Sequence, residues 1–359
     1  MTTSTPYHRL ARESPDFAHW RLPVAAVAGT GLYTALTVVL VIVAALVVVG
    51  SGASFDAWID SIGATVDTDE PGALLFQLIS IVLLLPCVLL SVALIWRRHV
   101  GYLHSVAGHV RWGWLGWCTV LAFAVVGTAL GLSIALAAAS GDALGFEAPG
   151  GRALLVLLIV VLVVPFQAAA EEYVFRGALM QLIGSWTRFA AVPVIATSLL
   201  FAAGHLYNIW GLVSVFLFGV VAALVTIRTG GLEAAVALHV ANNVVLLTLD
   251  ALGLIDSSGE GAGMWNEVVP STVMCLVFWG LVELSARRRD LQRRRPPLPA
   301  PAPAPVPAYV VVPPPPYVPP MEHAPAPVAP MPPAAVVPSQ PLVPPNAPSY
   351  PGDPGVWGR

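Results

Sequence analysis

The sequence predicts an all-α membrane protein: a polytopic transmembrane bundle of about eight helices, followed by a disordered proline-rich C-terminal tail. Hydrophobic residues make up 57% of the chain and charged residues only 10%, and its mean hydropathy is +0.78. Soluble domains carry about 25% charged residues. Apolar stretches near the roughly 20 residues that cross a bilayer recur along the chain. Strands of a membrane barrel would be shorter and would alternate in polarity, so we expect helices.

The apolar stretches define the expected helices in order. The first is longer than a signal-peptide core and no convincing small-residue cleavage site follows it, so we interpret it as a retained helix. The eight expected spans are residues 24–49, 73–96, 113–139, 152–175, 189–206, 209–228, 232–254 and 266–286.

Charge alternates between the loops and predicts the orientation. Arginines precede the first span, lie between the second and third and near residues 188 and 228, and follow the last span, whereas the alternate loops are acidic. The positive-inside rule then predicts a multi-pass protein of the cell membrane with both termini in the cytoplasm. Both termini on one side require an even number of spans, which supports eight.

Composition also predicts the division of the chain. Residues 1–23 form a cytoplasmic N-terminal segment, 24–286 the transmembrane domain, 287–295 a basic anchor, and 296–359 the proline-rich tail. The tail cannot form a packed core and favours an extended polyproline conformation, so we expect a spacer or a docking strand for a partner. We see no nucleotide-binding loop and no soluble catalytic domain, and we expect no nucleic-acid partner.

Two adjacent carboxylates and an arginine, Glu171, Glu172 and Arg176, end a long apolar run. Each ionised group at a membrane centre costs about 2.5 to 3.5 kcal/mol, so such groups pair, face a polar cavity or perform chemistry. Glu172 lies four residues before Arg176, the favoured order for an intrahelical ion pair. Glu171 points to another face and is free to act as a general base. The alternative is that all three only anchor the helix end.

Two later apolar spans carry histidines with a partner four residues away. Phe201 precedes His205, and His239 precedes Asn243 on the same helix face. A lone histidine in an apolar helix is more often a packing residue than a catalyst. Two convergent donors such as His239 and Asn243, however, are what an oxyanion needs. Asn242 is offset by one residue and is expected to pack between helices.

These three motifs, Glu-Glu-x-x-x-Arg, Phe-x-x-x-His and His-x-x-x-Asn, resemble those of the CAAX-protease and bacteriocin-processing (CPBP) family of intramembrane endopeptidases. The resemblance covers about residues 110–255, the expected catalytic core. It implies that Glu171 and His205 activate a water for attack on a peptide carbonyl. It further implies that Glu172 and Arg176 order the site with structural support from Phe201, and that His239 and Asn243 stabilise the oxyanion.

The resemblance leaves the cofactor open, because the family has been described both as metalloproteases and as metal-independent glutamate proteases. Two histidines and a carboxylate are ligands that suit zinc, yet the paired histidines of a zincin helix are missing. We expect no cofactor, with zinc as the alternative. The expected substrate is a membrane-associated peptide or protein rather than a prenylated tail.

Two other functions and one geometric problem stay open at this point. The same cavity would serve a non-proteolytic immunity or peptide-binding protein, and buried carboxylates would serve a proton-coupled transporter, although no internal repeat is evident. Counting along the spans also places Glu171 near the inner surface and His205 near the outer one. They meet only if their helices are tilted, staggered or partly re-entrant.

Overall fold

The computed structural model describes residues 4–13, 17–63, 68–141, 145–146, 148–257 and 261–296. Contacts divide the chain into Met1–Ala300 and Pro301–Arg359. Apart from Pro296, the predicted tail lies outside the described residues, and its disorder stays a prediction.

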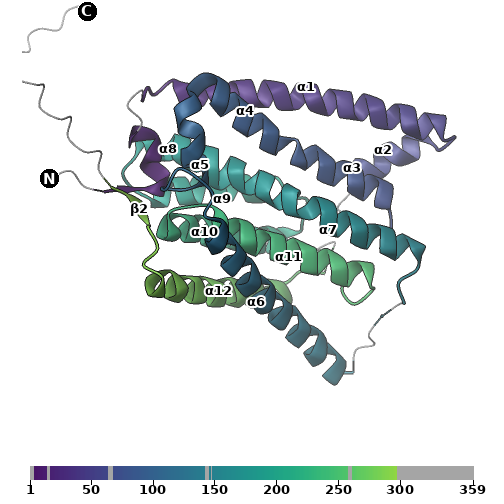
Figure 1. The fold of residues 1–359 in the computed structure, drawn as a ribbon. Coiled ribbons are helices and arrows are strands. Elements are labelled where there is room, and N and C mark those ends of the chain that lie inside the picture. The colour runs from purple at the N-terminus through teal and green to yellow at the C-terminus, as the bar shows by residue number, and fades with distance from the viewer. Residues whose placement is uncertain are drawn as a thin grey trace, which may run out of the picture. The chain divides into compact units, whose positions relative to one another are not determined.

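The described chain is a bundle of helices, which confirms the predicted fold class (Figure 1). Its α-helices are α1 Arg21–Gly50, α2 Phe55–Gly63, α3 Pro71–Val82, α4 Leu84–Trp96, α5 Val100–His104, α6 Trp112–Ala139, α7 Gly151–Glu172, α8 Met180–Trp186, α9 Ala191–Ala203, α10 Ile209–Thr229, α11 Glu233–Ala251 and α12 Val269–Arg288. The shorter elements are the 3-10 helices η1 Tyr7–Glu13 and η2 Arg97–His99, the π-helices η3 Tyr173–Leu179 and η4 Met264–Val268, and the strands β1 Thr5–Pro6 and β2 Arg294–Arg295.

Seven helical stretches in the described part of the chain are long and apolar enough to cross a membrane. They are Arg21–Gly50, Pro71–Trp96, Trp112–Ala139, Gly151–Trp186, Ile209–Thr229, Glu233–Ala251 and Met264–Arg288. The expected span at 189–206 is instead the 13-residue helix α9. At about 1.5 Å per residue α9 reaches only about 20 Å, less than the hydrocarbon core of about 30 Å. The count of eight full spans is therefore replaced by seven long helices and one short one.

The fourth span continues well beyond its predicted end at residue 175. Helices α7, η3 and α8 follow one another without a break from Gly151 to Trp186, a stretch of 36 residues. This stretch is about 54 Å long at about 1.5 Å per residue. The two glutamates therefore lie in the middle part of a long helix and not at its end.

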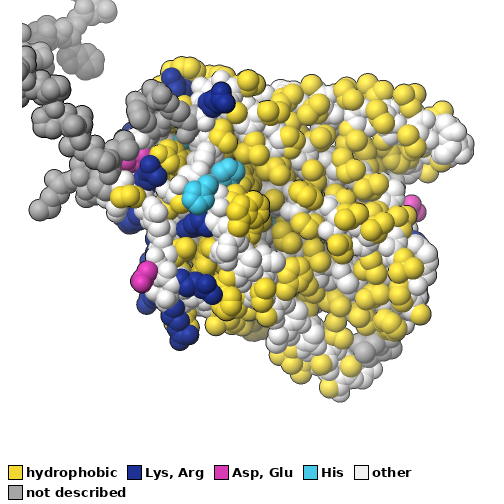
Figure 2. Space-filling view, in the orientation of Figure 1, with side chains coloured by type: hydrophobic (Ala, Val, Ile, Leu, Met, Phe, Trp, Pro, Cys, Tyr) yellow, Lys and Arg dark blue, Asp and Glu magenta, His cyan; other side chains and the backbone are white. Residues whose placement is uncertain are grey.

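Small side chains hold the centre of the bundle together. Helix α11 packs against α6, α7 and α10, and its alanines at 234, 235, 237 and 241 are buried in the largest hydrophobic cluster. In lipid there is no strong hydrophobic drive between helices, so close approach at small residues favours their association. Apolar side chains cover most of the face of the bundle that Figure 2 shows.

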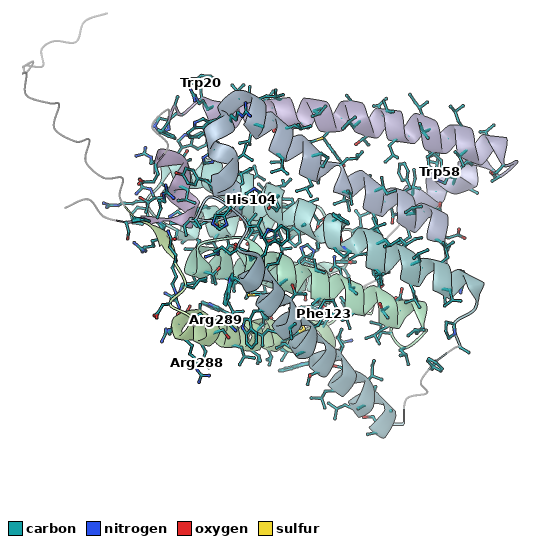
Figure 3. The ribbon with its side chains drawn as sticks, viewed as in Figure 1. Trp20, Trp58, His104, Phe123, Arg288 and Arg289 are labelled. Atoms are coloured by element: carbon teal, nitrogen blue, oxygen red, sulfur yellow. The ribbon has the colours of Figure 1, made fainter. Side chains whose placement is uncertain are left out.

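One end of the bundle gathers the positive charge and both ends of the described domain. Strand β1 pairs antiparallel with β2, with Thr5 opposite Arg295, and blue side chains cluster there in Figure 2. Figure 3 places Trp20, His104, Arg288 and Arg289 toward this end and Trp58 at the opposite one. We call the first the basic end. The two termini of the domain therefore lie on one side, and which side of the membrane this is stays a prediction.

An ion pair between a partly buried arginine and a buried glutamate joins several segments at the basic end. Arg111, just before α6, donates from Nη2 to Glu233 Oε2 at 2.7 Å and from Nε to Oε1 at 2.8 Å. Its Nη1 also donates to the backbone carbonyls of Thr229 and Gln292. Two-pronged arginine–carboxylate contacts fix geometry as well as charge. This pair therefore sets how α6, α10, α11 and the segment after α12 meet.

Acid should weaken this end of the domain. Burial lowers the pKa of His8 and of His99 from the usual 6.5 to about 4. Between these values the unfolded chain binds protons that the folded chain excludes, so the free energy of unfolding falls as pH falls through the window. Above it both states are neutral and no effect is expected. Thermal melts in detergent at a series of pH values measure this loss.

His99 stacks on Trp96 with ring centroids 4.3 Å apart, so His99→Phe should keep the packing and remove part of the acid sensitivity. His109→Ala, at an exposed position, is the matched control and should behave as wild type. Equal acid sensitivity in His99→Phe and wild type would contradict the assignment.

Candidate active site

Glu172 and Arg176 form a fully buried ion pair on the long fourth span. Arg176 Nη1 donates to Glu172 Oε1 at 2.9 Å, and both side chains are 0% exposed. The guanidinium of Arg176 also lies over the ring of Phe201, 4.2 Å from its centroid. This cation–π contact stabilises a desolvated arginine. The predicted intrahelical pair is present, and it connects the fourth span to α9.

The helix changes its hydrogen bonding directly after the two glutamates. The π-helix η3 runs from Tyr173 to Leu179 and includes Arg176. Short π-helical turns inside α-helices are frequent at functional sites, because the extra residue changes which side chains face a neighbour. Tyr173 accepts or donates a hydrogen bond with His104 Nδ1 at 2.5 Å, depending on the tautomer. That contact fixes the first π turn to α5.

His239, from α11, lies between the two glutamates. Its Nδ1 is 2.8 Å from Glu172 Oε1, and its Nε2 is 3.3 Å from Glu171 Oε2. Because Glu172 is ion-paired with Arg176, its carboxylate is ionised and can only accept hydrogen bonds. The Nδ1 of His239 must therefore carry the proton of the hydrogen bond between them. The Nε2 of His239 faces Glu171 at 3.3 Å: it donates to the ionised carboxylate when the ring is doubly protonated, and it accepts when the carboxyl group carries the proton. Both ring nitrogens contact carboxylates, a closer association with the glutamates than the sequence indicated.

Phe201 is the packing centre around which the site is arranged. Its ring contacts those of His205, His239, Phe175 and Phe218, at centroid distances of 4.9, 5.7, 5.3 and 6.3 Å. Aromatic edges and faces in such contacts add to the energy of burial. Phe201 therefore packs against both site histidines, and its supporting role stays a prediction.

His205 lies just beyond the end of α9, in the turn that closes this helix. The backbone carbonyl of Phe201 accepts from the Gly204 amide and from His205 Nδ1, the latter at 2.9 Å. A carbonyl only accepts, so Nδ1 carries the proton and the neutral ring leaves Nε2 with a free lone pair. The ring of Tyr207 lies 5.6 Å away. His205 is thus presented as a base or a ligand.

Glu171 and Asn243 are joined through a residue that the sequence analysis missed, Gln167. Gln167 Nε2 donates to Glu171 Oε2 at 3.0 Å, and Asn243 Nδ2 donates to Gln167 Oε1 at 3.2 Å. Asn242 Nδ2 in turn donates to Asn243 Oδ1 at 3.1 Å. The available signal was spacing, since Gln167 precedes Glu171 by four residues and shares its helix face.

The depth problem disappears in this geometry. Glu171 lies within the continuous fourth span, and the short helix α9 brings His205 only part of the way along the bundle. Phe201 contacts the rings of His205 and His239, and His239 contacts Glu171. The predicted placement of Glu171 and His205 at opposite surfaces is therefore wrong, because it assumed that each apolar run was one complete span.

The donor set does not suit a zinc site in this arrangement. Among the described residues, no three His, Cys, Asp or Glu side chains are placed to hold one metal ion. His239 has both ring nitrogens directed at carboxylates, which leaves His205 and Glu171 as two donors where three are needed. The expectation on cofactors stays a prediction, and no chemical step below passes through a metal.

Known proteins match the part of the chain that contains these residues. The family model described as type II CAAX prenyl endopeptidase Rce1-like matches residues 152–245. The uncharacterized protein YyaK of Bacillus subtilis (strain 168) is 32% identical over 107 residues, which are 28% of this chain and 36% of that protein. An uncharacterized 24.3 kDa protein of Escherichia coli is 33% identical over 159 residues, 42% of this chain and 70% of that protein. No solved structure matches.

The chain thus spans about a third of the Bacillus relative and over two thirds of the Escherichia coli relative. The matched range includes both glutamates, Arg176, Phe201, His205, His239, Asn243 and Gln167, and it leaves out His104. The chain belongs to the Rce1-like family of type II CAAX prenyl endopeptidases, within the CPBP family of intramembrane endopeptidases.

Proposed function

We propose that this protein hydrolyses a peptide bond of a membrane-associated peptide or protein within the bilayer. The observation that carries the proposal is the contact of His239 with both glutamates, 2.8 Å from Glu172 and 3.3 Å from Glu171, beside a histidine with a free lone pair. Charged and titratable groups are held together at a depth where they would otherwise be expelled. Membership of an endopeptidase family gives this arrangement its reaction class.

In the proposed reaction Glu171 and His205 remove a proton from a bound water. The hydroxide oxygen attacks the peptide carbonyl carbon, and the carbonyl electron pair moves to oxygen. Glu171 is 12% exposed, and no described residue hydrogen-bonds its Oε1, so this oxygen is free to meet the water. The proton taken from the water then passes to the leaving nitrogen, the C–N bond breaks, and a carboxylic acid and an amine leave.

Asn243 and His239 are the proposed donors to the oxyanion. Asn243 Nδ2 has two hydrogens and uses one of them on Gln167. For His239 the donor would be Nε2, which faces Glu171 at 3.3 Å. Because Nδ1 already donates to Glu172, the ring in this proposal is the doubly protonated imidazolium. A carboxylate that has gained the proton of the water binds this N–H less strongly. The N–H is then released toward the oxyanion when negative charge develops there, and such donors act most strongly in a site that excludes water.

The orientation of the protein follows from the basic end. We propose that this end faces the cytoplasm, since arginine-rich loops remain on that side. Strand β2 lies there, next to β1, and the proline-rich tail follows it in the sequence. We propose that the tail binds a cytoplasmic partner, because extended proline-rich segments dock at low entropic cost.

Loss of either base should abolish turnover. Glu171→Gln and His205→Ala should each lower peptide cleavage at least about a hundredfold, the usual scale for a general base. The assay uses purified full-length protein in detergent, with the peptide that wild type cleaves fastest from a pool of internally quenched apolar peptides. Proteomic comparison of wild-type and Glu171→Gln membranes should show a substrate that accumulates uncut.

Glu267→Gln and His109→Ala are the matched controls for this test. Glu267 accepts from Ser214 and His109 is exposed, and both lie outside the site. Normal cleavage by Glu171→Gln would contradict the proposed role of Glu171. If peptides of the pool bind to wild type and are never cut, the protein is a peptide-binding protein and not a protease.

Arg176→Ala should harm folding more than chemistry. The change leaves the Glu172 carboxylate without its cation, and breaking a buried pair costs about 3 to 5 kcal/mol. Thermal melts in detergent and expression level should both fall sharply. Arg176→Lys keeps the charge but loses the planar contact over Phe201, so an intermediate melt is expected. A normal melt with activity lost would make Arg176 a direct participant in the reaction.

A further inference from the structure

A buried amide, Gln167, lies where the water-activating and oxyanion groups of the proposed site meet. It is on α7, one turn before Glu171, and its side chain is 5% exposed. Both functional atoms of its amide are used. Nε2 donates to Glu171 Oε2 at 3.0 Å and Oε1 accepts from Asn243 Nδ2 at 3.2 Å. It is therefore the hydrogen-bonded link between the fourth span and α11 on this side of the site.

The charge of Glu171 determines how the amide groups of Gln167, Asn243 and Asn242 are oriented. An ionised carboxylate only accepts hydrogen bonds, so Gln167 must present its NH2 group to Glu171. Its carbonyl then faces Asn243, which must present its own NH2, and the carbonyl of Asn243 in turn faces the NH2 of Asn242. The amide groups are oriented in series by one charge, and each hydrogen bond strengthens the next.

This row of hydrogen-bonded amides leaves one oxygen of Glu171 and one hydrogen of Asn243 free for the proposed reaction. Gln167 occupies Oε2 of Glu171, so that Oε1 remains for the water. It also occupies one Nδ2 hydrogen of Asn243, so that the other remains for the oxyanion. We propose that Gln167 is a positioning residue that fixes Glu171 and Asn243 relative to each other across the α7–α11 contact. This inference rests on the proposed function.

A packing role alone would not require this geometry. A methionine fills nearly the same volume as glutamine, but it would leave a hydrogen of Asn243 without its partner in a water-poor interior. It would also leave Oε2 of Glu171 with only the longer contact to His239. Both groups would then turn toward other partners, away from the reactive arrangement. Reacting groups displaced by about 1 Å lose rate by about two orders of magnitude. The effect should therefore appear in kcat rather than in KM.

The test compares Gln167→Met with Gln181→Met, using the purified full chain and the quenched peptide described above. Gln181 is 0% exposed and donates to the Tyr102 carbonyl at 2.7 Å, so it is a buried glutamine of the same long helix outside the site. Gln167→Met should lower kcat about 10- to 100-fold, up to the loss expected for a displacement of about 1 Å, with KM little changed. Gln181→Met should lower the melting temperature but leave kcat unchanged.

Gln167→Glu adds a second measurement, the pH dependence of activity, which a role in packing alone would not change. A carboxylic acid donates to Glu171 only while it holds a proton, so the activity of this variant relative to wild type should rise as pH falls. Gln167→Met should show no such rise. A constant ratio for Gln167→Glu across pH, or a wild-type kcat for Gln167→Met, would overturn the proposal.

A melting experiment tests the link without activity. In Asn243→Leu the hydrogen bond to Gln167 is already lost, so adding Gln167→Met should lower the melting temperature less than it does in wild type. Additive losses would show that the two residues are not coupled and would overturn the inference. If Glu171→Gln cleaves normally while the losses are non-additive, the coupling stands and the proposed function fails. If Glu171→Gln is inactive while Gln167→Met is normal, only the inference on Gln167 fails.

Discussion

The burial of charge inside an apolar bundle is the constraint on which this site depends. Glu172 and Arg176 are both 0% exposed and 2.9 Å apart, and neither would be tolerated alone in a low-dielectric interior. After pairing, each of the two side chains still makes one contact with another helix. Arg176 lies over Phe201 of α9, and Glu172 accepts from His239 of α11. One intrahelical ion pair thereby contacts two further helices, and the candidate catalytic side chains lie where these three helices meet.

Continuity of the fourth span places the two glutamates inside a long helix and not at its end. A helix that ended at the glutamates would expose them at the membrane surface, where water screens charge and competes for every hydrogen bond. Helices α7, η3 and α8 run together for 36 residues instead, with the π-helix beginning at Tyr173. The short α9 complements this arrangement, because its early end presents His205 inside the bundle. A long helix and a short one thus meet at one level.

The basic end supports the same helices by other means. Glu233 begins α11 and is held by Arg111, while His104 of α5 contacts Tyr173 at the first π turn. The helices that carry Glu171 and His239 are therefore both anchored at this end by polar contacts. The contacts of this end therefore hold the start of α11 and the first π turn of the fourth span, the two helices that also carry the site.

The sequence by itself determined the membrane class, most of the spans, and the pair formed by Glu172 and Arg176, because composition and the helical repeat act locally. It also selected Glu171, His205, His239 and Asn243 through their spacing. Only the tertiary structure decided where the fourth span ends, that α9 is short, and that Gln167 joins Glu171 to Asn243. Spans are predicted from the average polarity of a stretch of sequence. Charged residues inside a helix lower that average, so they are taken for the end of the span even when partners on other helices neutralise them. Those partners are far apart in the chain, and only packing brings them together.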